Sequence, residues 1–192
     1  VRDDDVYWNM ADPGWAYGLF YALAGPLLLG KPVIFLNAPF DVEGTYRFLE
    51  RHQVTNATTA PTVFRMMRAA GSLPSDKPVL QLRLASCAGE PLNPDVVAWG
   101  KAHLGVSIHD HYGQTEGSMM VCNHHLPSLR RELRPGSMGQ AMPGFRIVIL
   151  DNDGAEVEPG QEGQIAVDTH HSPLFWFRGY YQDPKRTRER FT

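Results

Sequence analysis

Residues 82–112 read LRLASCAGEPLNPDVVAWGKAHLGVSIHDHY, and this stretch decides the fold class. Its first part, residues 82–88, is mostly apolar or small, as is typical of a buried strand. Asn93 and the proline after it begin a predicted helix, which ends before Gly105. Residues 106–112 form a second predicted strand. A strand, a helix and a strand in this order predict a βαβ unit with parallel strands.

The same alternation extends toward the start of the chain. Apolar and β-branched runs predict strands there, and apolar residues three or four positions apart predict helices. The expected elements are a strand at residues 6–10, a buried strand at 32–36, a helix at 42–52, a strand at 54–59 and a helix at 61–70. These elements extend the parallel sheet, so residues 1–112 are expected to form an α/β sheet lobe.

The pattern changes after about Gly113. Short alternating runs at residues 145–150 and 164–168 flank the sequence DNDG, a strong turn signal, and a last helix is expected to begin at Asp183. The fold class is therefore α/β, with a parallel-sheet βαβ lobe followed by a smaller antiparallel β-barrel-like lobe at residues 113–192.

Composition and charge narrow the class of protein. The 192 residues carry a net charge of −3 and are 43% hydrophobic, so we expect a folded chain without a basic face for nucleic acid. Two cysteines, Cys87 and Cys122, fit a reducing compartment, which is the cytoplasm or, in a eukaryote, the mitochondrial matrix. No apolar run reaches about 18 residues, so no membrane-spanning helix is expected.

Two motifs indicate weaker alternatives. Residues 25–32, GPLLLGKP, resemble a phosphate-binding P-loop, but Pro32 stands where that motif needs a magnesium-binding Ser or Thr. We interpret them instead as a helix end capped by Gly30, followed by a strand. His109 and His111 alternate on a predicted strand and could share a metal, but no third ligand stands out, so ordinary hydrogen-bonded histidines are expected.

The strongest candidate for chemistry lies where two predicted strands end. One strand ends at Ala88 and continues into the sequence GEP, and the next continues into residues 112–117, YGQTEG. A right-handed crossover places both ends at the same edge of the sheet, where open α/β sheets bind ligands. The residue types suit a nucleotide: a glycine for close approach, an aromatic ring for stacking, a hydroxyl for phosphate and a carboxylate for magnesium. From the residues alone, two polar loops with turn glycines fit equally well.

The chain resembles the adenylate-forming superfamily, which contains acyl-CoA synthetases, peptide-synthetase adenylation domains and luciferases. Residues 112–116, YGQTE, match its YGxTE signature. Further motifs follow the expected order: DPGW at 12–15, TAPT at 59–62, AGEP at 88–91, GSMG at 136–139, GQEG at 160–163 and RGYYQDP at 178–184. Their details are most similar to the acetyl- and medium-chain acyl-CoA synthetase branch. The resemblance implies the central-to-late part of the large N-terminal domain of such an enzyme.

This resemblance implies an ATP-dependent ligase that forms acyl-CoA. A carboxylic acid would attack ATP to give an acyl-adenylate and pyrophosphate, and coenzyme A would then displace AMP. The implied catalytic residues are Thr115, near the α-phosphate, and Glu116, which would hold Mg²⁺. The implied nucleotide-binding residues are Gly89, Glu90, Pro91, Asp110, His111, Tyr112, Gly113, Gln114 and Thr115. The implied partners are the three small-molecule substrates, the rest of the large domain and a C-terminal domain.

The resemblance also implies where the acyl group binds. The implied pocket residues are Trp15, Ala16, Tyr17, Ala88 and Gly113. Acetate-specific relatives carry a tryptophan at the position of Gly113, which closes the pocket. A glycine there, together with the small Ala88, favours medium-chain or aromatic acids over acetate. Tyr17 is larger than the residue expected of acetate enzymes, and it would cap the pocket or hydrogen-bond an aryl substituent.

Several parts of the family's site are expected outside these residues. The phosphate loop normally precedes the aromatic motif, and the ribose-binding aspartate, the hinge and the catalytic lysine normally follow the last motif. Residues 1–192 alone are therefore expected to form no acyl-adenylate. Two other functions stay open: an adenylation domain that feeds a carrier protein, and a non-catalytic nucleotide-binding homologue.

Overall fold

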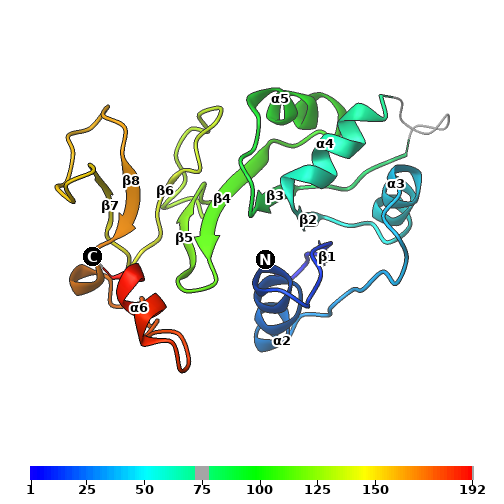
Figure 1. The fold of residues 1–192 in the computed structure, drawn as a ribbon. Coiled ribbons are helices and arrows are strands. Elements are labelled where there is room, and N and C mark those ends of the chain that lie inside the picture. The colour runs from blue at the N-terminus through cyan, green and yellow to red at the C-terminus, as the bar shows by residue number, and fades with distance from the viewer. Residues whose placement is uncertain (72–77, 192) are drawn as a thin grey trace.

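The computed structural model describes residues 1–71 and 78–191, which contain two β-sheets. Helices α3 (Val42–Arg51), α4 (Pro61–Ala69) and α5 (Pro94–His103) are gathered beside the larger one (Figure 1). The larger sheet of this part has the strand order β1-β2-β3-β4-β5-β6. Its strands are β1 (Tyr7–Asn9), β2 (Asn56–Thr59), β3 (Leu84–Ala88), β4 (Ile108–Gln114), β5 (Ser118–Cys122) and β6 (Gln140–Ala141). Strands β1 to β4 pair in parallel, whereas β5 pairs antiparallel with both β4 and β6.

The smaller sheet is an antiparallel pair of strands, β7 (Ile147–Leu150) and β8 (Gln164–Val167). It lies at the end of the molecule opposite α3 (Figure 1). A mainly parallel sheet and a small antiparallel sheet confirm the predicted α/β class. The expected lobe boundary at residues 112/113 falls within β4, and the division into residues 1–112 and 113–192 stays a prediction.

The helices begin at the local signals that the sequence contains. Helix α3 (Val42–Arg51) follows Asp41, whose side chain accepts a hydrogen bond from the Gly44 amide at 2.7 Å. A proline begins each of three others, as suits a first helical turn. These helices are α4 (Pro61–Ala69), α5 (Pro94–His103) and α6 (Pro184–Arg190). The remaining helical segments are α1 (Ala16–Gly18), the π-helical segment η1 (Leu19–Ala24), α2 (Gly25–Leu28) and the 3-10 turn η2 (Thr169–His171). In the described ranges, none of the helices is both long and apolar enough to cross a bilayer.

One face of the larger sheet carries the hydrophobic core. Side chains of α3, α4 and α5 pack there against β1 to β4. The core residues are Trp8, Tyr46, Leu49, Val54, Ala57, Phe64, Met67, Ala85, Cys87, Leu92, Val96, Leu104 and Ile108. Complete burial of one large apolar side chain stabilises a fold by about 1.5–3 kcal/mol. This packing holds the strands whose ends carry the candidate site.

The opposite face of the same strands is polar. Successive strand residues point to opposite faces, so the residues between the core positions face away from α3, α4 and α5. The buried polar residues at these positions are Asn9, Asn56, Thr58, Ser86 and His109. Segment η1 covers part of this face, where the Tyr7 hydroxyl donates a hydrogen bond to the Tyr21 carbonyl at 2.8 Å. The sheet therefore separates an apolar structural face from a polar one.

The predicted buried strand at residues 32–36 is wrong. These residues form no strand, and Phe35 and Leu36 are 53% and 45% exposed. An apolar run becomes a strand only when another strand pairs with its backbone, and β1, at the edge of the sheet, pairs with β2 alone among the described residues. The helix end predicted before this segment is confirmed, because Gly30 has a φ of +66° and the next amide donates to the Pro26 carbonyl at 2.8 Å.

Candidate active site

Strands β3 and β4 end next to each other at one edge of the larger sheet. They pair in parallel with Ala88 opposite His111, so both strands reach that edge in the same direction, as the crossover rule predicts. Gly89 follows β3 with a φ of +99°, which favours glycine, and no atom lies within 4 Å of a Cβ built on it. The backbone at Gly89 is therefore open to close approach by a flat ligand.

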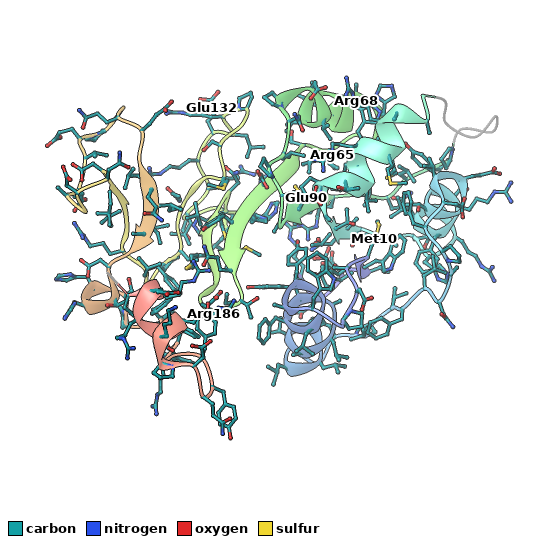
Figure 2. The ribbon with its side chains drawn as sticks, in the orientation of Figure 1. Met10, Arg65, Arg68, Glu90, Glu132 and Arg186 are labelled. Atoms are coloured by element: carbon teal, nitrogen blue, oxygen red, sulfur yellow. The ribbon has the colours of Figure 1, made fainter. Side chains whose placement is uncertain are left out.

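Glu90 is held by two side chains of α4. Its Oε2 accepts hydrogen bonds from Arg65 Nη2 and from Thr62 Oγ1, the second at 2.6 Å, and Figure 2 shows Arg65 and Glu90 next to each other. Arg65 also donates to the Pro91 carbonyl at 3.2 Å. The Thr62 hydrogen bond, together with Arg65, lowers the pKa of Glu90 against the opposing effect of burial. Helix α4 thus keeps the Glu90 carboxylate ionised and holds its loop in position.

Asp110 joins the same loop to β4. Its carboxyl group is buried, accepts a hydrogen bond from the Leu92 amide at 3.3 Å and lies 3.6 Å from the Cys87 sulfur. Burial raises the pKa of Asp110 and also that of the Cys87 thiol. Asp110 therefore ties the loop after Pro91 to the start of the predicted nucleotide-binding segment, residues 110–115.

A cavity of about 440 Å³ lies between the β4–β5 hairpin and the smaller sheet. Tyr112, Gln114 and Glu116 line it on one side, and residues of β7, β8 and α6 line it on the other. Gln114 Nε2 donates to the Tyr112 hydroxyl at 2.6 Å, and Thr115 is exposed in the turn that follows. The volume falls within the range of small-molecule sites, about 300–1,000 Å³.

Glu116 connects this hairpin to the segment around α6. The Tyr180 hydroxyl donates a hydrogen bond to Glu116 Oε1, and Arg190 Nη2 lies 3.5 Å from the same oxygen. The Tyr180 hydrogen bond is the main cause that lowers the pKa of Glu116, and Arg190 adds to it. No other side chain of residues 1–71 and 78–191 donates to its second oxygen, Oε2.

The predicted acyl-pocket residues come from separate elements. Trp15 and Ala16 lie at the start of α1, where Trp15 is about half exposed. Tyr17 follows on the same helix, and its ring lies 5.5 Å from the ring of Tyr21. Ala88 is buried at the end of β3. The small residues Ala16 and Ala88 thus belong to the N-terminal helical segment and to the sheet, respectively.

Two buried side-chain polar atoms in the described part of the chain lack a hydrogen-bond partner: the Tyr17 hydroxyl and His111 Nδ1. Burial raises the pKa of Tyr17 well above its ordinary value, and neighbouring groups including Cys87 and Asp110 add to this. An unpaired buried polar group costs about 1–3 kcal/mol, so each such atom calls for a partner.

Gly113 is required by strand pairing. The register of β4 and β5 shifts between Tyr112 and Gly113, which marks a bulge. A Cβ on Gly113 would overlap the Ser118 carbonyl oxygen and would lie 2.9 Å from the Met119 Cα atom. Glycine here lets two backbones approach each other, and a tryptophan would need a different hairpin. The role of Gly113 in acyl-group size therefore stays a prediction.

The histidines of β4 pack against the loop that follows β5. The rings of His109 and His125 lie 3.9 Å apart, and His125 Nε2 is 3.0 Å from the Ser86 hydroxyl. Burial, assisted by neighbouring histidines, lowers the pKa of His111 to about 4 and that of His125 to about 3. Within the described ranges, no group of three or more His, Cys, Asp or Glu side chains is arranged to hold a metal ion. These histidines are neutral, packed side chains at pH 7.

The donors at this edge fit a nucleotide that brings its own cation. Mg²⁺ usually binds one or two protein carboxylates together with phosphate oxygens of its substrate, so it does not need a full set of protein ligands. Glu116 has a carboxylate that would suit one such position, and Thr115, the residue before it, has an exposed hydroxyl. The open backbone at Gly89 and the ring of Tyr112 are surfaces that would suit a base.

The sequence reasoning missed the residues that anchor this site from other elements. Thr62 and Tyr180 lie in the motifs TAPT and RGYYQDP, so those motifs contained a signal, although the resemblance suggested no contact for either. Arg65 and Arg190 carried no comparable signal, because their partners are chosen by the packing of α4 and α6.

Comparisons with known proteins show what the chain is similar to. A family model described as AMP-binding enzyme matches residues 1–181. Acetyl-coenzyme A synthetase of Bacillus subtilis (strain 168) is 37% identical over 169 residues, which cover 87% of this chain and 29% of that enzyme. The crystal structure of Brucella canis acyl-CoA synthetase matches with a TM-score of 0.86 and 51% identity, over 95% of this chain and 33% of that chain.

A benzoate CoA ligase from Burkholderia xenovorans LB400 has a similar structure as well. It matches with a TM-score of 0.84 and 25% identity, over 98% of this chain and 37% of that chain. This chain thus spans about a third of the length of the relatives that it matches.

Proposed function

The chain belongs to the AMP-binding enzyme family, and on that premise we propose that it is part of an ATP-dependent acyl-CoA synthetase. In this proposal, a carboxylic acid is activated as an acyl-adenylate with release of pyrophosphate. The acyl group is then transferred to coenzyme A with release of AMP. The observation that carries the proposal is that β3, which leads into residues 89–91, and β4, which leads into residues 112–116, run in parallel to the same sheet edge. Tyr112, Gln114 and Glu116 there line a cavity of small-molecule size.

Nucleotide binding is assigned to the two strand ends. The open backbone at Gly89 suits close approach by an adenine base, and the ring of Tyr112 suits stacking on such a base. Glu90 is immobilised by Arg65 and Thr62, so the loop it belongs to is preorganised for a ligand. The remaining residues of the assigned site are Pro91, Asp110, His111, Gly113 and Gln114.

The adenylation step is assigned to Thr115 and Glu116. The acid attacks the α-phosphorus as a carboxylate, a P–O bond forms, and the bond from that phosphorus to the bridging oxygen of pyrophosphate breaks. The exposed hydroxyl of Thr115 donates a hydrogen bond to an α-phosphate oxygen that gains negative charge. Glu116 would hold Mg²⁺, and the bound ion would neutralise negative charge on the phosphate groups.

The acyl group is assigned to the region of Trp15, Ala16, Tyr17 and Ala88. Ala16 and Ala88 are small, and the unpaired, buried hydroxyl of Tyr17 can bond a polar group on an acid. Two of the similar proteins are named for acetate and for benzoate, so the relatives include both a short and an aromatic acid. We favour medium-chain or aromatic acids over acetate, because Ala16 and Ala88 leave room for a larger acyl group. The Tyr17 hydroxyl could also hydrogen-bond a substituent on an aromatic acid.

We also propose that the protein works in a reducing compartment. Cys87 and Cys122 are both free and buried, which agrees with a reducing compartment such as the cytoplasm or the mitochondrial matrix. The proposed partners are ATP, a small carboxylic acid and coenzyme A, with the rest of the same protein.

Exchange of labelled pyrophosphate into ATP by the full-length protein tests the function. We expect exchange that depends on an added acid, followed by formation of acyl-CoA and AMP when coenzyme A is present. Exchange without any coenzyme A product would indicate an adenylation domain that feeds a carrier protein. ATP binding without exchange for any acid would indicate a non-catalytic homologue. Each of these two outcomes contradicts the proposal.

A further inference from the structure

We propose that Tyr180 is a positioning residue for Glu116, and that Arg190 is a counter-ion that the cation accompanying ATP replaces. This inference rests on the proposed function, in which Glu116 holds that cation. Tyr180 lies 64 residues after Glu116 in the sequence, yet the two side chains are hydrogen-bonded. The contact joins the β4–β5 turn, at the edge of the cavity, to the segment around α6.

Tyr180 is itself held in place by its surroundings. Its backbone amide donates to the Thr187 hydroxyl at 2.8 Å, and its ring meets the Phe177 ring edge-on at 5.0 Å. The Arg186 guanidinium, labelled on α6 in Figure 2, lies 4.2 Å from the centre of the Tyr180 ring. These contacts fix the ring from several sides. The direction of its hydroxyl toward Glu116 is therefore set before any ligand binds.

The glycine before Tyr180 is part of the same arrangement. Gly179 has a φ of +139°, and a Cβ built on it would lie 2.7 Å from the Thr187 methyl carbon. Close packing of this turn against α6 therefore depends on a glycine at this position. This turn places the Tyr180 hydroxyl within hydrogen-bonding distance of Glu116.

Both contacts to Glu116 use one oxygen of its carboxylate. Tyr180 donates to Oε1, and Arg190 Nη2 lies 3.5 Å from that atom, while Arg190 Nε donates to the Tyr180 hydroxyl at 3.2 Å. In the described part of the chain, Oε2 receives no hydrogen bond from another side chain. Glu116 lines the cavity, and Oε2, which no described side chain holds, is the oxygen left for a cation.

Tyr180 and Arg190 differ in charge, and this difference predicts opposite effects on cation binding at Glu116. The Arg190 side chain is 50% exposed and lies farther from Oε1 than a normal charged hydrogen bond, so its hold is weak. A cation at Oε2 would be repelled by Arg190, since both are positive. Tyr180 carries no charge, so its hydrogen bond can persist when the cation binds. Tyr180 therefore supports cation binding, and Arg190 opposes it.

The test compares the affinity of the full-length protein for a non-hydrolysable ATP analogue with and without Mg²⁺, by calorimetry. The ratio of the two affinities isolates the contribution of the cation and requires no turnover. Tyr180→Phe is expected to lower this ratio about tenfold, as for loss of a hydrogen bond to a charged group. Arg190→Gln is expected to raise the ratio about two- to fivefold, the size of an exposed ion pair.

Two matched controls lie on the same segment. Tyr181→Phe changes a tyrosine that is 90% exposed, and Arg188→Gln changes an exposed arginine of α6. Neither variant is expected to change the ratio. If Tyr180→Phe lowers the melting temperature by more than a few degrees, the exposed Arg190→Gln variant decides the test.

The Glu116→Gln variant distinguishes a failure of the proposed function from a failure of the roles given to Tyr180 and Arg190. If Glu116→Gln keeps the wild-type ratio, Glu116 is not the cation ligand and the proposed function loses that assignment. If Glu116→Gln lowers the ratio but Tyr180→Phe behaves as the wild type, the present inference alone is overturned. If Arg190→Gln lowers the ratio as Tyr180→Phe does, both residues are merely structural and the counter-ion role is overturned.

Discussion

Asp5 and Arg83 lie 78 residues apart in the sequence and form an ion pair that joins the start of the chain to the segment before β3. Arg83 Nη2 contacts Asp5 Oδ1 at 2.7 Å and Oδ2 at 2.5 Å. The Asp5 side chain is only 1% exposed and also accepts a hydrogen bond from the Thr55 hydroxyl at 2.9 Å. Burial raises the pKa of Asp5, but these hydrogen bonds outweigh it and hold that pKa well below its ordinary value.

Replacement of Arg83 by methionine is therefore expected to destabilise the fold by about 3 kcal/mol, since it leaves a buried carboxylate without its counter-charge. Urea denaturation of the full-length protein at pH 7 measures the change. Arg47→Met, which removes an exposed ion pair with Glu43 on α3, is the control and should change the free energy of unfolding by less than about 1 kcal/mol. Equal effects of the two substitutions would contradict a structural role for the Asp5–Arg83 pair.

Stability should fall as the pH drops from about 6.5 toward 4, because an unfolded histidine has a pKa near 6.5. Burial lowers the folded-state pKa of His111 to about 4 and of His125 to about 3, so in this window the unfolded chain binds protons that the folded chain does not. Each such histidine costs up to about 1.4 kcal/mol per pH unit. Melting temperatures at several pH values measure this slope.

The histidine variants supply the control for this slope. His125→Gln should flatten the pH dependence, whereas His103→Gln, at an exposed position on α5, should leave it unchanged. A slope that is the same in all three proteins would show that other groups cause the acid sensitivity.

Arg65→Gln should weaken nucleotide binding more than it weakens the fold. Arg65 contacts both Glu90 and the Pro91 carbonyl, but it is only partly buried, so we expect a small change in melting temperature. Loss of its hold on the loop should lower ATP affinity of the full-length protein by about tenfold, the effect of a lost hydrogen bond to a charged group. Arg68→Gln breaks the neighbouring ion pair with Asp95 and serves as the control, with ATP affinity unchanged.

Glu116→Gln should lower the rate of adenylation far more than the affinity for the acid. An amide is a poor ligand for Mg²⁺ compared with a carboxylate. Loss of one such transition-state contact commonly costs about 2.7–4 kcal/mol, or about a hundredfold to a thousandfold in rate. Pyrophosphate exchange at saturating Mg²⁺ measures the loss, and near-normal turnover there would rule out this role.

Ala88→Leu should exclude long or aromatic acids and spare short ones. Ala88 is buried at the end of β3, so three added carbon atoms would occupy the space assigned to the acyl group. Each displaced methylene of the substrate forfeits about 0.8 kcal/mol. We expect kcat/KM for octanoate and benzoate to fall by about tenfold or more, while acetate holds or gains. A wild type that already prefers acetate would contradict the pocket assignment.

Tyr17→Phe removes only a hydroxyl from the same region and leaves its shape unchanged. Because that hydroxyl is buried without a partner, the variant should fold at least as stably as the wild type. Melting temperature measures this. Acids that bear a polar group should lose more kcat/KM than plain alkyl acids, and a marked loss of stability would show that the hydroxyl has a partner in the full-length protein.

Local patterns in the sequence determined most elements of this fold. Prolines at the first turns of α4, α5 and α6, and Asp41 and Asp183 before α3 and α6, act through their own backbone and nearest neighbours. The order of strands and helices then predicted a parallel sheet, and the crossover rule predicted that the ends of β3 and β4 meet. These features depend on residues close together in the chain, so they follow from the sequence alone.

Tertiary packing decided the features that depend on a distant partner. Residues 32–36 have the composition of a strand, but no described strand pairs with them. Gly113 has a steric role that becomes visible only when β5 lies against β4. Which oxygen of Glu116 is held, and by which side chains, depends on where α6 packs. The physical reason is that hydrogen bonds and close contacts between distant segments depend on atomic positions, which a local pattern of residue types does not contain.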